Sequence, residues 1–266
     1  MTGISFIIIK YKGDFYENLV RNIGQSCDCP HEIVEIDNTK GVYSSIAVAY
    51  NSNVARAKFE LICFLHEDVL FKHSCGWNVL KLMSDHPDIG LLGLVGAKFK
   101  SLQVTSYTNK IENRRYIRGR LANYQTIDNK PFEEVVCVDG VFLLTRKSLL
   151  SKIMFDEQII TGFHGYDMDF SLQVFHAGYK VAITQGIDLI HFSTGKRDLV
   201  WLQTNQRISQ KWRKLLPIAS RDLKYGRAKC LMLEVKTFFW LNELSATKAL
   251  LKFPVALIKW LLVKWR

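Results

Sequence analysis

Short polar clusters follow apolar runs at three places in this sequence. These clusters are Asp37-Asn38, His66-Glu67-Asp68 and Asp139-Gly140. In an open α/β sheet, ligands bind beyond the carboxyl ends of the strands, so clusters at successive strand ends predict one shared binding site. A single acid after a strand commonly just caps the next turn, and it is the recurrence that favours a functional interpretation.

His66 and Asp68 could bind a metal ion together. They directly follow the apolar run Leu61–Leu65 and are separated by a single residue, Glu67. Side chains two apart on an extended chain point to the same side. Carboxylate oxygen suits Mg²⁺ or Mn²⁺, and a nearby imidazole favours Mn²⁺. Such an ion would neutralise a leaving diphosphate. The alternative is a loop whose acid caps the following helix.

Two acids, Asp167 and Asp169, open a stretch with helical spacing after Gly165-Tyr166. Acids in a first helical turn interact favourably with the helix dipole, which is the structural explanation. The functional one is a general base that takes a proton from a sugar hydroxyl. His191 follows the short run Leu189-Ile190, and a lone histidine of this kind is more often structural than a ligand.

The elements that must position these residues alternate between strand and helix. Apolar runs at 5–10, 33–36, 60–65 and 89–95 predict strands, and helical spacing at 15–24, 44–57 and 76–84 falls between them. This alternation predicts a doubly wound α/β sheet. Further strands are expected within 134–144 and at 180–183 and 189–191, with helices at 147–153, 203–216, 228–244 and 249–266. The polar segment 98–131 is expected to be a loop.

The ordered motifs resemble the family 2 glycosyltransferases, and within them the bacterial glycosyltransferase-like group linked to capsule and surface polysaccharides. The resemblance covers about residues 4–195 and includes "FLHEDV", "VDGVFLLTRKSL", "GFHGYDMDFSLQVFHAGYKVAI" and "IHFSTG". It implies a GT-A fold, a Rossmann-like mixed sheet that binds a nucleoside diphosphate sugar. We therefore expect a catalytic domain at 1–200 and a helical extension at 201–266.

The resemblance also implies roles for single residues. Asp37 matches the acid that contacts the nucleotide base, and Asp68 matches the last aspartate of the Asp-x-Asp metal motif. Asp139 matches an acid near the acceptor and donor sugar. Asp167 matches the catalytic base, and His191 matches a position that completes some metal sites. Transfer would then be a single in-line displacement with inversion.

Neighbouring residues of the same motifs are assigned by proximity. Asn38, Gly140, Tyr166 and Asp169 are expected to bind substrate. Two positions depart from the family pattern. His66 stands where the first metal-binding aspartate is usual, and Tyr166 stands where a glutamate normally precedes the base. These departures leave the identity of the metal, Mn²⁺ or Mg²⁺, and the pKa of Asp167 open.

The net charge of +11 is concentrated at the C-terminus, because Arg221–Arg266 contributes +7 of it. In a helix over 248–266, one narrow stripe carries Lys248, Lys252, Lys259 and Arg266, Lys264 lies off it, and the remaining surface is apolar. The lysines leave no uncharged run of membrane-spanning length, so an in-plane helix on an anionic inner leaflet is expected, with the protein cytoplasmic and peripheral. Packing on the catalytic domain or on a second copy is the alternative.

Composition and motifs limit the other classes. No Cys-x-x-Cys pair is present, and the six cysteines are expected to be reduced thiols. The basic cluster Lys110–Arg120 could clamp the diphosphate of a donor or of a lipid-linked acceptor, or be a solvated loop; no nucleic-acid partner is expected. Alternatives to a transferase are a scaffold of the same fold and, less favoured, a sugar-phosphate nucleotidyltransferase. No Gly-x-Gly-x-x-Gly follows a strand, which argues against a dehydrogenase.

Overall fold

The computed structural model describes residues 2–103, 113–115, 130–192, 198–221 and 229–235. Seven strands form its central sheet, in the order β2 (His31–Asp37), β1 (Ile4–Lys10), β3 (Leu61–Leu65), β11 (Phe142–Arg146), β5 (Ile89–Gly93), β12 (Lys180–Ile183) and β9 (Glu133–Val135). β2, β1 and β3 are parallel, as are β5 and β12, whereas β11 and β9 run antiparallel to their neighbours. The predicted mixed α/β sheet is confirmed.

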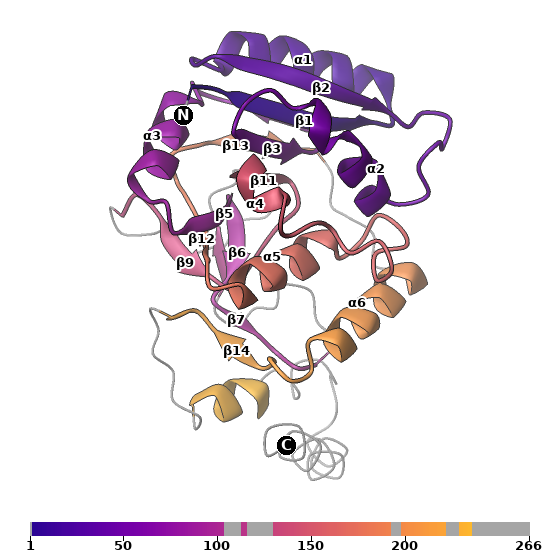
Figure 1. Cartoon of the computed structure of the whole chain (residues 1–266), viewed down its shortest axis with the longest axis vertical. Helices are drawn as coiled ribbons and strands as arrows, with labels where there is room; N and C mark the ends of the chain where they lie inside the picture. Colours follow the sequence, from indigo (N-terminus) through magenta and orange to yellow (C-terminus); the bar gives the residue numbers. More distant parts are fainter. Residues whose placement is uncertain (1, 104–112, 116–129, 193–197, 222–228, 236–266) are drawn as a thin grey trace.

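Helices cover both faces of this sheet (Figure 1). They are α1 (Gly13–Ser26), α2 (Ile46–Asn53), the 3-10 turn η1 (Val54–Arg56), α3 (Trp77–Asp85), α4 (Lys147–Leu150), α5 (Tyr166–His176) and α6 (Leu199–Lys211). Residues 229–235 are also helical, within the range predicted for a helix.

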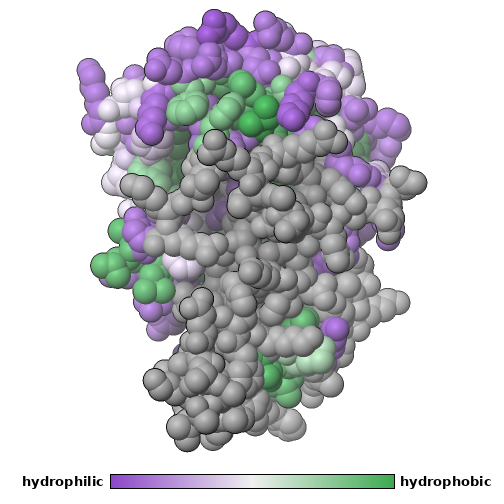
Figure 2. Space-filling model, turned by 180° about the vertical axis from the view of Figure 1, so that it is seen from behind, coloured by the Kyte–Doolittle hydropathy of each residue, from purple (hydrophilic) through white to green (hydrophobic). Residues whose placement is uncertain are grey.

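Alternation along the strands divides the core into two layers. On β1, Phe6 and Ile8 pack with apolar residues of α1 and α3, while Ile7 and Ile9 pack on the other face with residues of α2 and α5. α1 is amphipathic: its buried residues are Tyr16, Leu19 and Ile23. Hydrophilic residues cover the end of the molecule that carries α1 and β2 (Figure 2).

Three small sheets complete the fold. They are β10 (Cys137–Val138) with β6 (Val95–Ala97) and β8 (Asn113–Arg115), β13 (Leu189–His191) with β4 (Val69–Phe71), and β14 (Ile218–Ala219) with β7 (Phe99–Lys100). The prediction of a loop throughout 98–131 is wrong, because β7 and β8 lie in this range. The lysines hid the strand signal: Lys98 and Lys100 are 4% and 1% exposed, and Lys98 is ion-paired with Glu133.

α6 begins earlier and ends earlier than the predicted helix at 203–216. It begins at Leu199 because the Asp198 carboxylate caps it, accepting a hydrogen bond from the backbone N–H of Trp201 at 2.9 Å. The expected domain boundary at residue 200 falls inside this helix. The division into two domains stays a prediction, since most of 201–266 lies outside the described residues.

Among the described residues, no helix is long and apolar enough to cross a membrane.

Candidate metal and catalytic site

The three residues that follow β3, His66, Glu67 and Asp68, point alternately to opposite sides of the chain. The carboxylate of Glu67 accepts hydrogen bonds from the backbone N–H groups of Tyr11 and Lys12, at 2.8 and 2.9 Å, and so caps the start of α1. His66 and Asp68, on either side of it, face each other, with His66 Nδ1 lying 3.8 Å from Asp68 Oδ1. The extended backbone thus separates a structural acid from the two predicted metal ligands.

His191 reaches the same place from a distant part of the chain. Its Nε2 lies 3.4 Å from Asp68 Oδ1. The β4–β13 pair fixes this approach, since His191 is opposite Val69 in the ladder and the N–H of Phe192 donates to the carbonyl of Asp68 at 3.0 Å. Side-chain donor atoms of His66, Asp68 and His191 all lie within 4.8 Å of one another, so the structure brings all three predicted ligands together.

The protonation of this cluster suits metal binding. Burial and the adjacent His191 lower the pKa of His66, so its imidazole is neutral at pH 7. Burial raises the pKa of Asp68, but the hydrogen bond from His191 and the electrostatic interactions with both histidines outweigh burial and lower it. Two imidazoles and a carboxylate fit Mn²⁺ better than Mg²⁺, which prefers an all-oxygen shell.

Tyr166 selects the tautomer of His66. Its hydroxyl donates its single hydrogen to the carbonyl of Gly140 at 3.1 Å. The 2.7 Å contact with Nε2 of His66 must therefore carry a hydrogen from the imidazole to the tyrosine oxygen. The lone pair of Nδ1 is then left facing Asp68. The residue that replaces the family's glutamate thus orients a predicted metal ligand.

Gly140 makes room for this arrangement. A Cβ at this position would lie 2.0 Å from the Tyr166 hydroxyl, and the Tyr166 ring is itself buried. We therefore expect Gly140 and Tyr166 to shape the site rather than to contact substrate with their side chains.

Asp167 is held at the start of α5 beside this network. Its Oδ2 accepts from the N–H of Gly140 at 3.1 Å and its Oδ1 from that of Met168 at 2.9 Å. Burial, followed by the negative charge of Asp139, raises the pKa of Asp167 to about 7. A carboxylate with this pKa is matched to proton transfer near neutral pH.

Asp139 is placed by the turn between β10 and β11. Its N–H donates to the carbonyl of Val95 at 2.8 Å, and its Oδ1 accepts from the N–H of Val141 at 2.8 Å. The residue is only partly buried. Its charge acts on both His66 and Asp167, so it belongs electrostatically to the same site.

Three other predicted substrate residues have their polar groups engaged elsewhere. Asp37 is exposed, and its Oδ1 accepts from the N–H and hydroxyl of Thr39. Asn38 is buried and bonds both backbone polar groups of Tyr43, which shapes the loop before α2.

Asp169 is 1% exposed and faces α6. Its carboxylate accepts from Lys211 Nζ at 2.8 Å and from the indole N–H of Trp212 at 2.7 Å. This interaction accounts for the acid without a ligand, so we expect its role to be structural.

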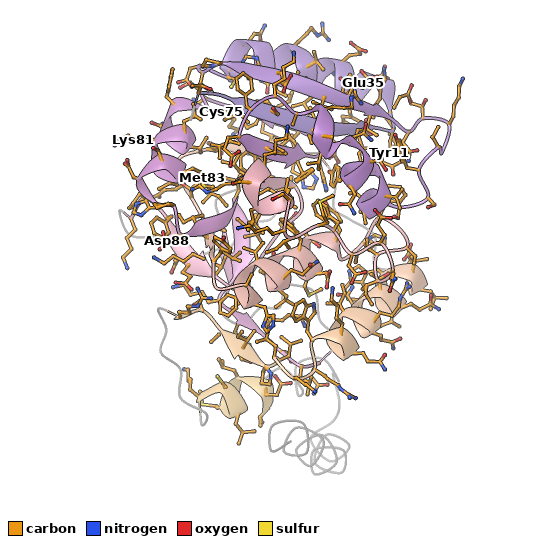
Figure 3. All side chains as sticks on the ribbon, in the orientation of Figure 1. Tyr11, Glu35, Cys75, Lys81, Met83 and Asp88 are labelled. Atoms are coloured by element: carbon orange, nitrogen blue, oxygen red, sulfur yellow. The ribbon has the colours of Figure 1, made fainter. Side chains whose placement is uncertain are left out.

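Sequence reasoning missed Glu67 and Tyr11. The period-two alternation that pairs His66 with Asp68 also sends Glu67 to the opposite side, which is a signal for a bracing role. Tyr11 lies beyond the carboxyl end of β1 (Figure 3), donates its N–H to Glu67, and packs its ring edge-on against Phe163 at 5.1 Å.

Residues 5–213 match the model of the Glycosyltransferase like family. The chain belongs to this family. One curated relative, the streptomycin biosynthesis protein StrF of Streptomyces griseus, is 24% identical over 161 residues, which are 60% of this chain and 55% of that protein. The match thus spans about half of the relative's length.

Solved glycosyltransferase structures share the fold at 12% identity. GalNAc-T7 with UDP, GalNAc and Mn²⁺ has a TM-score of 0.58 over 80% of this chain and 48% of that one. Staphylococcus aureus TarS with UDP has a TM-score of 0.54 over 92% of this chain and 73% of that one. The mannosyltransferase PcManGT of Pyrobaculum calidifontis, with GDP-Man and Mn²⁺, has 0.50 over 98% and 87%. This member of the family has the GT-A fold, as the resemblance implied.

Proposed function

We propose that this glycosyltransferase transfers a sugar from a nucleoside diphosphate sugar to a hydroxyl group in a metal-dependent reaction. The observation that carries the proposal is the convergence of His66, Asp68 and His191 next to a carboxyl group, Asp167, whose pKa is raised to about 7. Structural neighbours in complexes with UDP or GDP-Man, two of them with Mn²⁺, support it.

The three ligands would hold Mn²⁺, or less readily Mg²⁺, which would supply positive charge to the departing diphosphate. Asp167 would accept the proton of the acceptor hydroxyl as its oxygen attacks the anomeric carbon from the opposite side. The C–O bond to the diphosphate breaks, and the product has inverted configuration. Hydrogen bonds from the N–H groups of Gly140 and Met168 keep the Asp167 carboxylate in place.

A screen of nucleotide sugars tests this function. Each donor is incubated with the protein and Mn²⁺, with an excess of EDTA in the control, and the release of nucleoside diphosphate is measured. We expect one donor to be hydrolysed slowly in a metal-dependent way without acceptor. A protein that binds donors but never releases diphosphate, with or without saccharide and lipid-linked acceptors, would instead be a scaffold of this fold.

We further propose that the acceptor is a saccharide or a lipid-linked saccharide in surface polysaccharide or glycolipid synthesis, and that residues 248–266 bind the anionic cytoplasmic face of the membrane. These residues lie outside the described part, as do most of Lys110–Arg120, so the support is the charge pattern alone. Liposome flotation of the full chain and of a 1–245 truncation tests the membrane proposal. Equal flotation of the two would reject it and leave packing on this chain or on a second copy.

A further inference from the structure

Three cysteines lie together at the amino-terminal end of the sheet, away from the candidate metal site. Cys27 follows α1, Cys29 precedes β2, and Cys75 precedes α3. Figure 3 shows Cys75 and Tyr11 at opposite ends of the strands. Cys27 Sγ lies 3.7 Å from Cys29 Sγ, and Cys75 is paired with Cys27 across a backbone bridge. The glycosyltransferase chemistry proposed above uses none of these thiols.

The backbone holds Cys27 and Cys75 in register. They form an isolated parallel bridge, in which the N–H of Cys75 donates to the carbonyl of Ser26 at 2.8 Å and the N–H of Asp28 donates to the carbonyl of Cys75 at 3.2 Å. Paired residues in neighbouring strands have Cα atoms about 5 Å apart, within the range of about 4.4–6.8 Å that a disulfide spans. Cys27 and Cys29 also bring their sulfur atoms within 3.7 Å, but they are two apart in one chain and lack this backbone register.

Access and reactivity differ between the thiols. Cys27 is partly exposed, whereas Cys29 and Cys75 are buried. The neighbouring Cys75 thiol lowers the pKa of Cys27, and the same interaction together with burial raises the pKa of Cys75, so Cys27 is the thiol that ionises first. A nucleophilic, accessible sulfur therefore sits beside a shielded partner.

We propose that Cys27 and Cys75 form a reversible redox site, in which a small disulfide such as glutathione disulfide oxidises the pair. The Cys27 thiolate attacks one sulfur of glutathione disulfide and expels glutathione thiolate, leaving a mixed disulfide on Cys27. Cys75 then loses its proton to water and attacks the Cys27 sulfur, which expels a second glutathione. Two protein thiols are oxidised and one glutathione disulfide is reduced to two thiols.

The resulting bond would fix the segment that leads from the metal site to α3. Cys75 lies seven residues after Asp68, and β4 in between is already tied to α1: the side chain of Asn22 bonds both the N–H and the carbonyl of Phe71, at 2.6 and 3.0 Å. A Cys27–Cys75 disulfide adds a second, covalent tie between α1 and this segment. Oxidation therefore stabilises the β4–β13 pair, which includes His191 and directly follows Asp68.

The test is peptide mapping of the full chain after incubation with glutathione disulfide at pH 7.5 and blocking of the remaining thiols. We expect a Cys27–Cys75 linkage that dithiothreitol reverses, together with a Tm several degrees above that of the reduced protein. Cys63 and Cys137, both 0% exposed, serve as internal controls that stay reduced. Cys75→Ser should accumulate glutathione on Cys27, and Cys27→Ser should form neither product.

The alkylation rate of Cys27 against pH, measured in the unmodified protein, keeps the test independent of whether the variants fold. We expect its midpoint well below about 8.5, the value of an ordinary thiol. An ordinary midpoint, a Cys27–Cys29 linkage, or oxidation no faster than that of Cys230 would overturn the proposal.

Discussion

At the scale of single residues, the pKa values of two carboxyl groups of the candidate site are shifted in opposite directions: that of Asp68 is lowered and that of Asp167 is raised. Neighbouring histidines keep Asp68 ionised, whereas burial and Asp139 make Asp167 harder to ionise. An ionised acid suits metal binding, and an acid that titrates near neutrality suits proton transfer. Environment rather than residue type thus assigns the two roles.

The first prediction concerns the proposed base. Asp167→Asn keeps the shape of the side chain and can still accept a hydrogen bond from Gly140, but it cannot take a proton. Transfer should fall by at least about 10²–10³-fold, with the Kd for the donor changed by less than about threefold. Steady-state kinetics and calorimetry measure the two. Asp85→Asn, at an acid that pairs with Lys81 on the surface of α3, is the matched control. Turnover retained in Asp167→Asn would refute the assignment.

The pH dependence follows from the raised pKa of Asp167. The base must be ionised to accept a proton. We therefore expect kcat to rise with pH, to reach half of its maximum near pH 7, and to level off at higher pH. Asp139→Asn removes a negative charge, which stabilises the ionised form and lowers the pKa, so the midpoint should move to lower pH. A midpoint that stays put in this variant, in a pH series at saturating Mn²⁺, would exclude Asp139 as the source of the shift.

Tyr166→Phe tests whether the tyrosine orients His66. Losing the hydroxyl frees Nε2 of His66 and so allows the wrong tautomer to face Asp68. We expect weaker Mn²⁺ binding, by about 10-fold or more, with kcat at saturating Mn²⁺ much less affected. Tyr179→Phe is a control at a partly buried tyrosine just beyond the C-terminal end of α5. Unchanged Mn²⁺ affinity, or a loss of kcat that excess Mn²⁺ does not restore, would argue against the positioning role.

At the scale of elements, the contact between α5 and α6 sets the position of the proposed base. Asp169 is two residues after Asp167 on α5, and Lys211 and Trp212 at the end of α6 satisfy its buried carboxylate. Lys211 also pairs with Asp156 at 2.7 Å. Its ammonium group therefore joins α6 both to α5 and to the loop that precedes α5. These contacts hold the first turn of α5 on the side that faces α6.

Lys211→Met should therefore destabilise the protein, because it leaves the buried Asp169 carboxylate without its cation. We expect a loss of about 2–3 kcal/mol in the free energy of unfolding, less than for a fully buried pair since Lys211 is partly accessible. Urea denaturation measures it. Lys214→Met, at an exposed lysine three residues on, should change little, and adding Asp169→Asn should restore part of the loss. A Lys211→Met protein as stable as the control would disprove the role of this pair.

At the scale of the whole molecule, periodicity in the sequence predicted the sheet and the proximity of His66 to Asp68. Apolar runs located the strands, and alternation paired His66 with Asp68. The meeting of His191 with them could not be derived from spacing, because it depends on the β4–β13 pair, which joins segments more than a hundred residues apart. Only the family resemblance pointed to it.

Long-range side-chain contacts account for the remaining differences. Nothing local distinguishes Asp167 from Asp169, which lie in the same helical turn, yet one faces the site and the other faces α6. Lys98 and Lys100 lie in strands or between them despite their charge, because a partner such as Glu133 sits opposite. Sequence composition describes a residue's preference, whereas these positions are decided by what the fold places beside them.

The central claim is that His66, Asp68 and His191 bind a metal ion that the donor requires. The most direct test is calorimetry of the binding of one nucleotide sugar, the donor that the screen identifies, or of its nucleoside diphosphate. Binding is measured once with Mn²⁺ and once with EDTA. We predict tight binding only with Mn²⁺, lost in Asp68→Asn and kept in Asp85→Asn, where the changed acid pairs with Lys81 on the surface of α3. Equal binding with and without Mn²⁺, or Mn²⁺-dependent binding that survives Asp68→Asn, would contradict the account.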